Sequence, residues 1–158
     1  MRKSLLLLSA LLLAGTALAA SFRDVARAVN DDQMLIAAGL EPEAAVVRRQ
    51  CSASVIETDD PPESFDCVYV QTEKGVNLFS LEDGYLMAEM QVKLDVMDGV
   101  ALQRSGRWSQ VQVFSGERVA GFYVNDNAWI DKQKTEAVYQ WLLEHGVLAR
   151  DPQKWIGK

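Results

Sequence analysis

The stretch Ser105–Val124, SGRWSQVQVFSGERVAGFYV, decides the fold class of this chain. Val111-Gln112-Val113 alternates apolar and polar residues within the expected strand Trp108–Phe114, which is the period of a strand with one buried face, and Val119–Val124 is expected to form the next strand. Gly116 lies between the two segments, where a hairpin turn favours glycine. The stretch therefore predicts two antiparallel strands joined by a tight turn.

The same period extends back to Cys51, so we predict an antiparallel sheet over residues 51–124. The expected strands are Ser54–Ile56, Phe65–Val70, Val76–Phe79, Tyr85–Met90, Val92–Val96, Trp108–Phe114 and Val119–Val124. Residues 59–62, Asp-Asp-Pro-Pro, predict a turn. A hairpin centred there brings Cys51 close to Cys67, with a bulge or skewed turn to align them.

Helices are expected on both sides of the sheet. Residues 20–50 predict short helices: Ser21 caps the first, Asp31 or Asp32 caps Gln33–Ala38, and a third covers Glu43–Gln50. An amphipathic helix is expected over residues 128–145. The chain is therefore expected to form one α+β domain over residues 20–158, built on a small antiparallel sheet or barrel.

Residues 1–19 have the three parts of a secretory signal peptide. Arg2 and Lys3 give a positive start, a leucine-rich stretch follows, and Ala17-Leu18-Ala19 is a small-x-small cleavage site. The apolar run is shorter than the roughly 20 residues that a spanning helix needs. We expect cleavage near Ala19 and a periplasmic or secreted chain without a transmembrane segment.

Cys51 and Cys67 lie beyond this signal and would meet an oxidising compartment. A pair of cysteines in an exported domain usually forms a disulfide. The bond would close a loop with 15 residues between the cysteines, worth roughly 3 kcal/mol in the chain-entropy model. The alternative, a redox site, lacks a Cys-x-x-Cys motif.

Negative charge is concentrated in the sheet region. The chain has 16 Lys and Arg against 22 Asp and Glu, a net charge of −6. The predicted signal holds two of those cations and no acid, so the remainder carries −8, which disfavours nucleic acid and anionic lipid as partners. Between Glu57 and Asp98 there are 11 acidic residues against Lys74 and Lys93, a local charge of −9.

The densest acidic part is the first predicted hairpin, where aromatic residues are interleaved. An acidic patch with aromatic anchors suits capture of a cationic protein, because opposite charge speeds encounter and aromatic burial supplies binding energy. A solvated face that keeps the protein soluble is the alternative, and calcium binding lacks the usual Asp-x-Asp-x-Asp-Gly loop. The predicted partner-binding residues are Asp59, Asp60, Glu63, Phe65, Asp66 and Tyr69.

Residue types suited to catalysis are scarce. The single histidine, His145, falls in the last turn of a predicted helix, where the helix dipole favours its charged form. One histidine and two paired cysteines cannot build a zinc site, and no phosphate-loop or dinucleotide motif occurs. We predict no catalytic residue, no metal and no cofactor. A small carboxylate-dependent hydrolase is the weaker alternative.

Several short motifs lie between residues 76 and 124. They are Val76-Asn77-Leu78, Ser105-Gly106-Arg107-Trp108, Val111-x-Val113, Gly116 and Gly121-Phe122-Tyr123-Val124. This set resembles the bacterial SH3-like domains of exported cell-wall proteins, although Phe79 and Phe122 replace the arginine and sealing tryptophan of that family. The resemblance implies a small barrel with Trp108 plugging one end and a groove near Trp108 and Phe122 for a cell-wall or peptide ligand. A helix-capped barrel of the pleckstrin-homology-like type is the alternative.

The four tryptophans divide into two groups. Trp108, Trp129 and Trp141 fall on predicted core faces, whereas Trp155 lies in a polar tail and either folds back or is exposed. Together these features predict an exported, non-enzymatic binding protein, of inhibitor or immunity type, that faces a cationic protein. The alternative is an SH3-like module that binds cell wall or peptide.

Overall fold

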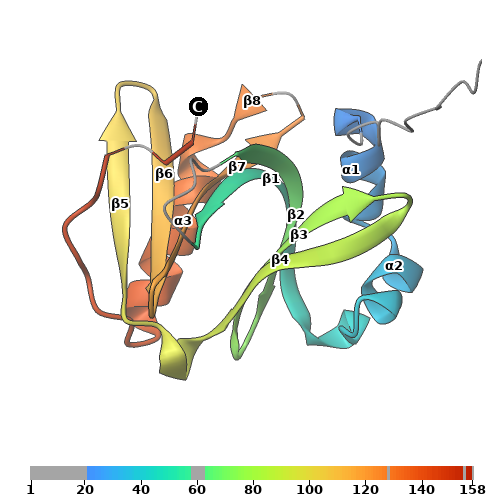
Figure 1. Ribbon diagram of the computed structural model, residues 1–158, viewed down its shortest axis with the longest axis horizontal. Coiled ribbons are helices and arrows are strands. Elements are labelled where there is room, and N and C mark those ends of the chain that lie inside the picture. The colour runs from blue at the N-terminus through green and yellow to red at the C-terminus, as the bar shows by residue number, and fades with distance from the viewer. Residues whose placement is uncertain (1–20, 58–62, 128, 155, 158) are drawn as a thin grey trace, which may run out of the picture.

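A strongly curved antiparallel sheet forms the body of the protein (Figure 1). The computed structural model describes residues 21–57, 63–127, 129–154 and 156–157. The helices are α1 (Phe22–Ala28), α2 (Asp32–Ala37) and α3 (Lys132–Glu144), with short 3-10 turns η1 (Pro42–Ala44) and η2 (Leu94–Val96). The strands are β1 (Ala45–Ile56), β2 (Ser64–Thr72), β3 (Gly75–Glu82), β4 (Tyr85–Lys93), β5 (Gly99–Ser105), β6 (Trp108–Ser115), β7 (Arg118–Asp126) and β8 (Trp129–Ile130). The predicted α+β class is confirmed.

Strand β1 is the centre of the sheet and the origin of its curvature. In the described residues the sheet has eight strands, ordered β4-β3-β2-β1-β7-β6-β5, and β8 pairs with β7. Residues 45–54 of β1 pair with β2, whereas residues 50–56 pair with β7. At the far side of the curl, the guanidinium of Arg118 in β7 donates to the Glu89 carbonyl of β4 at 2.6 Å. The sheet therefore folds round toward itself.

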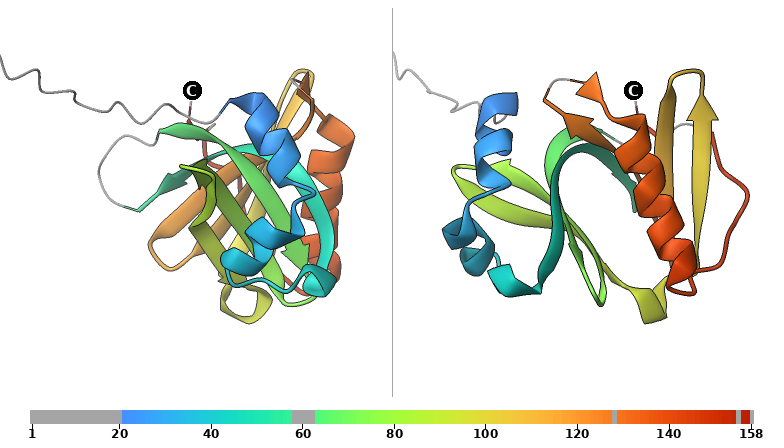
Figure 2. Two further views of the ribbon diagram at one scale, coloured as in Figure 1. Left: turned by 90° about the vertical axis from the view of Figure 1, so that its right-hand side faces the viewer. Right: turned by 180° about the vertical axis from the view of Figure 1, so that it is seen from behind.

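The two faces of the sheet carry separate apolar clusters. On the inner face, Cys51, Tyr69, Val111, Val113, Phe122 and Val124 pack with Val138 and Leu142 of α3. On the outer face, Val68, Val70, Phe79, Leu81 and Leu86 pack with Val25, Ala28 and Leu35 of α1 and α2. Figure 2 shows α3 beside β5 and β6, with α1 and α2 at the opposite end of the molecule. Alternate residues of one strand thus belong to different cores.

The predicted caps of the first two helices are confirmed. The Ser21 hydroxyl accepts from Asp24 N, and the Asp24 carboxylate accepts from Ser21 N, which is a capping box. The pKa of Asp24 is lowered, first of all because the Ser21 side chain donates to its carboxylate. Asp31 caps α2 through Gln33 N and Met34 N. Both caps need only neighbouring residues, so a sequence pattern can find them.

The third predicted helix, Glu43–Gln50, is wrong. Only Pro42–Ala44 turn as a 3-10 helix, and the chain is a strand from Ala45 onward. Arg48 in this strand holds the Asp32 carboxylate at 2.6 Å and donates to the Pro42 carbonyl at 3.1 Å. Pairing with β2, on a segment that contains Val46 and Val47, overrides the helical spacing.

Three further boundaries differ from the predictions. Leu94–Val96 is the turn η2 and not the end of a strand, and Leu94 N donates to the Lys74 carbonyl at 2.8 Å. Strand β5 was not predicted, because residues 99–102 are buried consecutively and therefore show no alternation. The last helix begins at Lys132 rather than residue 128, and Trp129–Ile130 form β8.

The predicted disulfide is present. Cys51 and Cys67 lie opposite each other in β1 and β2, with a Cα–Cα distance of 4.8 Å. Of the two predicted ways to align the cysteines, a bulge beside them is wrong, since regular pairing continues from Val47 to Ser54 and the register shift in this ladder falls between Ala45 and Val47. The alternative, a skewed turn, falls on residues outside the described ones.

Candidate functional site

The predicted acidic and aromatic residues of the β1–β2 hairpin do not lie together. Asp59 and Asp60 fall outside the described residues. Glu63 and Asp66 are exposed, and Phe65 is half-buried against the inner core. Tyr69 is fully buried, so its predicted role in partner contact is wrong.

Tyr69 and Phe122 are core residues. Their rings stack at 5.5 Å, both have 0% exposure, and the Tyr69 hydroxyl donates to Gln71 Oε1 at 2.8 Å. Burial raises the pKa of the Tyr69 phenol well above its ordinary value. Phe122 therefore cannot line a ligand groove with Trp108, and that part of the prediction is corrected.

The acidic residues of the sheet region also divide between separate places. Glu63 and Asp66 lie at the start of β2, whereas Glu73 follows the end of the same strand. Asp95 is in η2, near the C-terminal end of β2, where Leu94 N donates to the Lys74 carbonyl. Glu57 forms an ion pair with Arg118. A single acidic face, as the charge count predicted, is therefore not formed by these residues.

A cavity of about 750 Å³ lies instead on the outer face of the sheet, and we call it the aromatic hollow. It is lined by Phe22, Ser52, Asp66, Arg107, Trp108, Tyr123, Asn125, Trp129 and Ile130. These residues come from the start of α1, from β1, β2, β6, β7 and β8, and from the turn between β5 and β6. Segments that are far apart in the sequence thus meet at one site.

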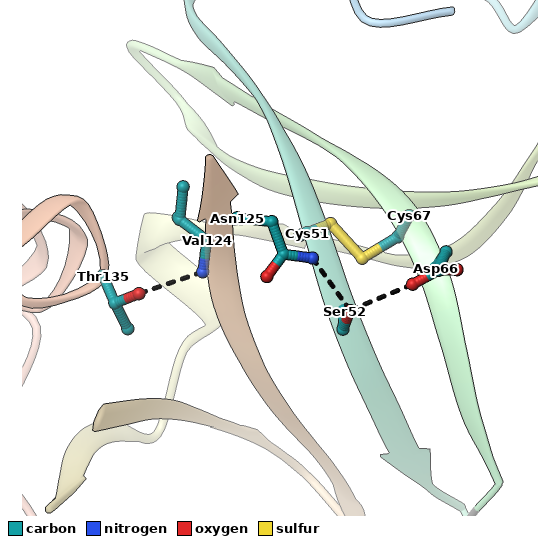
Figure 3. Close-up of a disulfide and its surroundings, with 7 residues drawn as sticks. All are labelled: Cys51, Ser52, Asp66, Cys67, Val124, Asn125 and Thr135. Carbon is teal, nitrogen blue, oxygen red and sulfur yellow. Dashed lines mark hydrogen bonds between the residues drawn. A yellow bond between two sulfur atoms is a disulfide. The ribbon is translucent and has the colours of Figure 1, made fainter. Parts of the chain in front are cut away.

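The floor of the aromatic hollow is a row of hydrogen-bonded polar side chains (Figure 3). Asn125 Nδ2 donates to Ser52 Oγ at 2.9 Å, and Ser52 Oγ donates to Asp66 Oδ1 at 3.1 Å. The row crosses β7, β1 and β2 in order. It leaves the second oxygen of the Asp66 carboxylate as an acceptor beside the cavity.

The inner face holds these three strands in place. The Cys51–Cys67 disulfide links β1 to β2 directly behind the polar row. On β7, the Val124 amide donates to Thr135 Oγ1 of α3 at 3.0 Å, and the Thr135 hydroxyl donates to the Asp131 carbonyl at 2.7 Å. A floor fixed in this way requires little reordering when a ligand binds.

Two tryptophans form the rim. The exposed fraction is 54% for Trp108 and 80% for Trp129. The prediction that both pack in the core, and that Trp108 plugs a barrel end, is therefore wrong. For Trp141, which is half-buried against the inner core, the packing prediction is confirmed; Trp155 lies outside the described residues.

A sequence signal for the rim existed. Trp108 directly follows the Gly106-Arg107 turn, and Trp129 follows the turn after Asp126. A strand end beside a turn is more exposed than a strand centre. The position of each tryptophan next to a turn therefore indicated exposure, although not that the two would share a cavity.

The aromatic hollow has opposite charges on different walls. Asp66 stands on the β2 side and Arg107 on the β5–β6 turn. Within the part of the chain that the structure describes, Arg107 forms no ion pair, and the Asp66 carboxylate accepts from a neutral hydroxyl. The site can therefore hold an aromatic or aliphatic group between a carboxylate and a guanidinium.

The single histidine lies elsewhere. His145 caps the end of α3, its ring stacks on Trp141 at 4.3 Å, and its Nδ1 is 2.8 Å from the Trp141 carbonyl. It is not among the residues that line the hollow. In the described ranges, three or more His, Cys, Asp or Glu side chains do not come together in a metal-binding group.

Two observations concern the compartment of the protein and its helices as possible membrane spans. The disulfide indicates an oxidising, non-cytoplasmic environment. None of the helices in the described ranges is long and apolar enough to cross a bilayer. The predicted signal peptide falls on residues outside the described ones.

Comparisons with family models, with curated proteins and with solved structures each find no match to this chain.

Proposed function

We propose that this chain is an exported, non-enzymatic binding protein and that the aromatic hollow captures a cationic protein. The observation that carries the proposal is the meeting of Trp108 and Trp129 with the Asp66 carboxylate in one cavity. The acidic and aromatic elements expected of a docking face are both present, but the aromatic residues are these tryptophans and not Phe65 and Tyr69.

A lysine or arginine of the partner suits this cavity. An indole face attracts a cation within about 6 Å of the ring, and the gain is largest where water is excluded. The free oxygen of Asp66 can accept from the same cation, and charge-assisted hydrogen bonds are the stronger kind. Arg107 on the other wall would meet a carbonyl or carboxylate beside the bound cation, which orients the partner.

The tryptophans would supply most of the binding energy. Hot spots at interfaces are enriched in Trp and Arg, and truncation of such a residue typically costs about 2 kcal/mol or more. The net charge of −6 would speed encounter with a basic protein. The predicted signal peptide supports an encounter in the periplasm or outside the cell, and the disulfide is compatible with it.

The test measures binding of an arginine-rich peptide to the purified chain by calorimetry. We expect Trp129→Ala to weaken binding about tenfold or more, and Asp66→Asn to weaken it less while reducing its salt dependence. Tyr85→Ala and Asp95→Asn are matched controls, because both residues are exposed and lie outside the hollow. Equal affinity in all four variants would exclude the hollow as the site.

A second candidate is a cell-wall or peptide ligand, as the SH3-like resemblance implies. The neutral hydrogen-bonding row of Asn125 and Ser52, beside the exposed face of Trp108, favours it, because a sugar ring stacks on an indole while its hydroxyls bond to such groups. Retention on purified cell wall that survives about 0.5 M salt, and is lost in Trp108→Ala, would select this ligand over a cationic protein.

A further inference from the structure

The C-terminal segment Gln153–Gly157 lies across the outer face of β6 and β7, where two buried glutamines hold it. Gln110 is 1% exposed and Gln112 is 0% exposed. A carboxamide that is buried without partners is strongly unfavourable, so the hydrogen bonds of these side chains must be satisfied by whatever covers them. In this structure the cover is the C-terminal segment.

Both glutamines bind the main chain of that segment, and Gln112 Nε2 also donates to Gln110 Oε1 at 3.2 Å. Gln110 Oε1 accepts from Ile156 N at 3.0 Å, and Gln110 Nε2 donates to the Ile156 carbonyl at 2.7 Å. Gln112 Oε1 accepts from Gln153 N at 2.8 Å, and its Nε2 is 3.3 Å from the carbonyls of Gln153 and Lys154. Each carboxamide therefore pairs as a neighbouring strand would.

One side chain of the segment is an anchor. Ile156 is 5% exposed and lies over Gly121, where an added Cβ would be 2.8 Å from the Ile156 Cβ. Gln153 and Lys154 are exposed. Among the described residues of the segment, recognition thus depends on the main chain and on the aliphatic side chain of Ile156.

The segment can leave without the rest of the tail. The preceding residues have their own attachment: Val100 N donates to the Leu148 carbonyl at 2.9 Å, and Arg150 N donates to the Val100 carbonyl at 2.8 Å. The Arg150 guanidinium also lies 4.5 Å from the centre of the Phe114 ring. Asp151 and Pro152 are exposed and join the two attached parts.

The segment also ends beside the aromatic hollow. A small cavity between them is lined by Ser52, Tyr123, Gln110 and Ile156, among others. Ser52 and Tyr123 line the aromatic hollow as well. The segment continues past this small cavity to Gly157, which lies against Ser54 and Ser64 beside the hollow.

We propose that Gln110, Gln112 and Gly121 form a peptide-binding site for a main-chain segment with an aliphatic anchor, and that residues 153, 154, 156 and 157 occupy it as a displaceable resident ligand. The occupant that displaces them is a peptide of another chain, read through its main chain and one aliphatic side chain. The inference holds whatever ligand the aromatic hollow takes, because its contacts are those of Gln110 and Gln112.

The experiment uses the full chain carrying Ile156→Asp, which places a carboxylate over Gly121 and weakens the resident segment. The probe is a labelled peptide with the sequence of residues 151–157. We expect it to bind this variant at least tenfold more tightly than the unaltered chain, whose own segment competes at a high effective concentration. The same peptide with aspartate in place of isoleucine should bind at least tenfold more weakly.

Lys154→Asp is the matched control, since Lys154 is exposed and its side chain is not part of the recognition. This variant should bind the probe as weakly as the unaltered chain. Equal probe binding by the Lys154→Asp and Ile156→Asp chains, or no gain in a folded Ile156→Asp chain, would overturn the proposal.

Hydrogen exchange on the unaltered chain gives an independent test that needs no variant. The amides of Gln153 and Ile156 should exchange at least a hundredfold faster than those at the centre of β6, because the segment opens while the sheet stays folded. Exchange of both amides only with global unfolding would show a permanent lid and overturn the proposal.

Discussion

The outer face of the sheet is covered in two different ways on the two sides of β1. Over β2, β3 and β4 the face is aliphatic and aromatic, and two helices cover it. Over β6 and β7 the face presents Gln110, Gln112 and Gly121, and the C-terminal segment covers it through its main chain. The aromatic hollow lies between, bounded by Phe22 of α1 and by Tyr123 of β7.

The difference shows how side-chain chemistry selects the cover. Apolar contact has no direction, so Phe79 and its neighbours accept any helix with an apolar stripe. Carboxamides need donors and acceptors at set positions, and a helix has already used its own main-chain groups. Gln110 and Gln112 therefore select a non-helical chain segment, whose main-chain groups are still available.

The largest effect is expected under the helices. Phe79→Ala removes a ring with 0% exposure from the outer cluster and should lower the free energy of unfolding by about 3–5 kcal/mol. Urea unfolding followed by circular dichroism measures it. The hydrogen exchange of the Gln153 amide, compared with that of amides which exchange only on global unfolding, should be the same as in the unaltered chain. A loss of protection at Gln153 alone would show that the helices and the C-terminal segment do not cover the sheet independently.

Removal of the disulfide should come next. Replacing Cys51 and Cys67 together by alanine is expected to cost about 3 kcal/mol, because the unfolded chain regains the freedom of the closed loop. The bond lies behind the floor of the aromatic hollow, so ligand affinity should fall as well. Unfolding of the variant should not respond to reductant, whereas the unaltered chain should; identical midpoints would refute the expectation.

A smaller and more local effect is expected under the tail. Gln112→Leu removes the acceptor of the Gln153 amide and should cost about 1–2 kcal/mol. Because the freed groups of the tail can turn to water, the loss should be seen chiefly as faster hydrogen exchange at Gln153. Gln103→Leu is a control outside the tail contact. Unchanged protection of Gln153 would show that Gln112 does not hold the segment.

The smallest effect concerns the attachment of α3 to the inner face. The pKa of Glu136 is lowered, chiefly because the Ser109 hydroxyl donates to its carboxylate at 2.7 Å, with Arg104 as a further donor. A carboxyl group whose pKa is lower in the folded than in the unfolded chain stabilises the fold at pH values above its unfolded pKa, which is about 4.3. This stabilisation is lost as the pH falls through the folded pKa. Ser109→Ala should therefore cost about 1 kcal/mol at pH 7 and less below pH about 4.

Urea unfolding at several pH values measures this difference. Ser115→Ala is the comparison, because the Ser115 hydroxyl donates to a main-chain carbonyl and not to a carboxylate. The loss in free energy of unfolding caused by Ser115→Ala should be independent of pH. A Ser109→Ala cost that stays constant down to pH about 3 would refute the role of the Glu136 charge.

The features that were predicted depend on residues close together in sequence. Ser21 and Asp31 cap helices through amides two or three positions ahead, and the pattern of residues 108–114 predicted a strand, although both of its faces are buried and not one. The aromatic hollow was not predicted, because Trp108 and Trp129 become neighbours only when β6 and β8 both pair with β7. The exposure of a side chain depends on what covers it, and spacing does not contain that information.

Local patterns in the sequence alone determined the α+β class, the two helix caps and the cysteine pair, because each follows from short-range geometry or from chain composition. The tertiary structure decided that residues 45–50 are a strand and that Tyr69 and Phe122 are core. It also decided that the two glutamines of β6 receive the C-terminal segment. These outcomes depend on contacts between distant parts of the chain, whose energies exceed the local preferences of the residues involved.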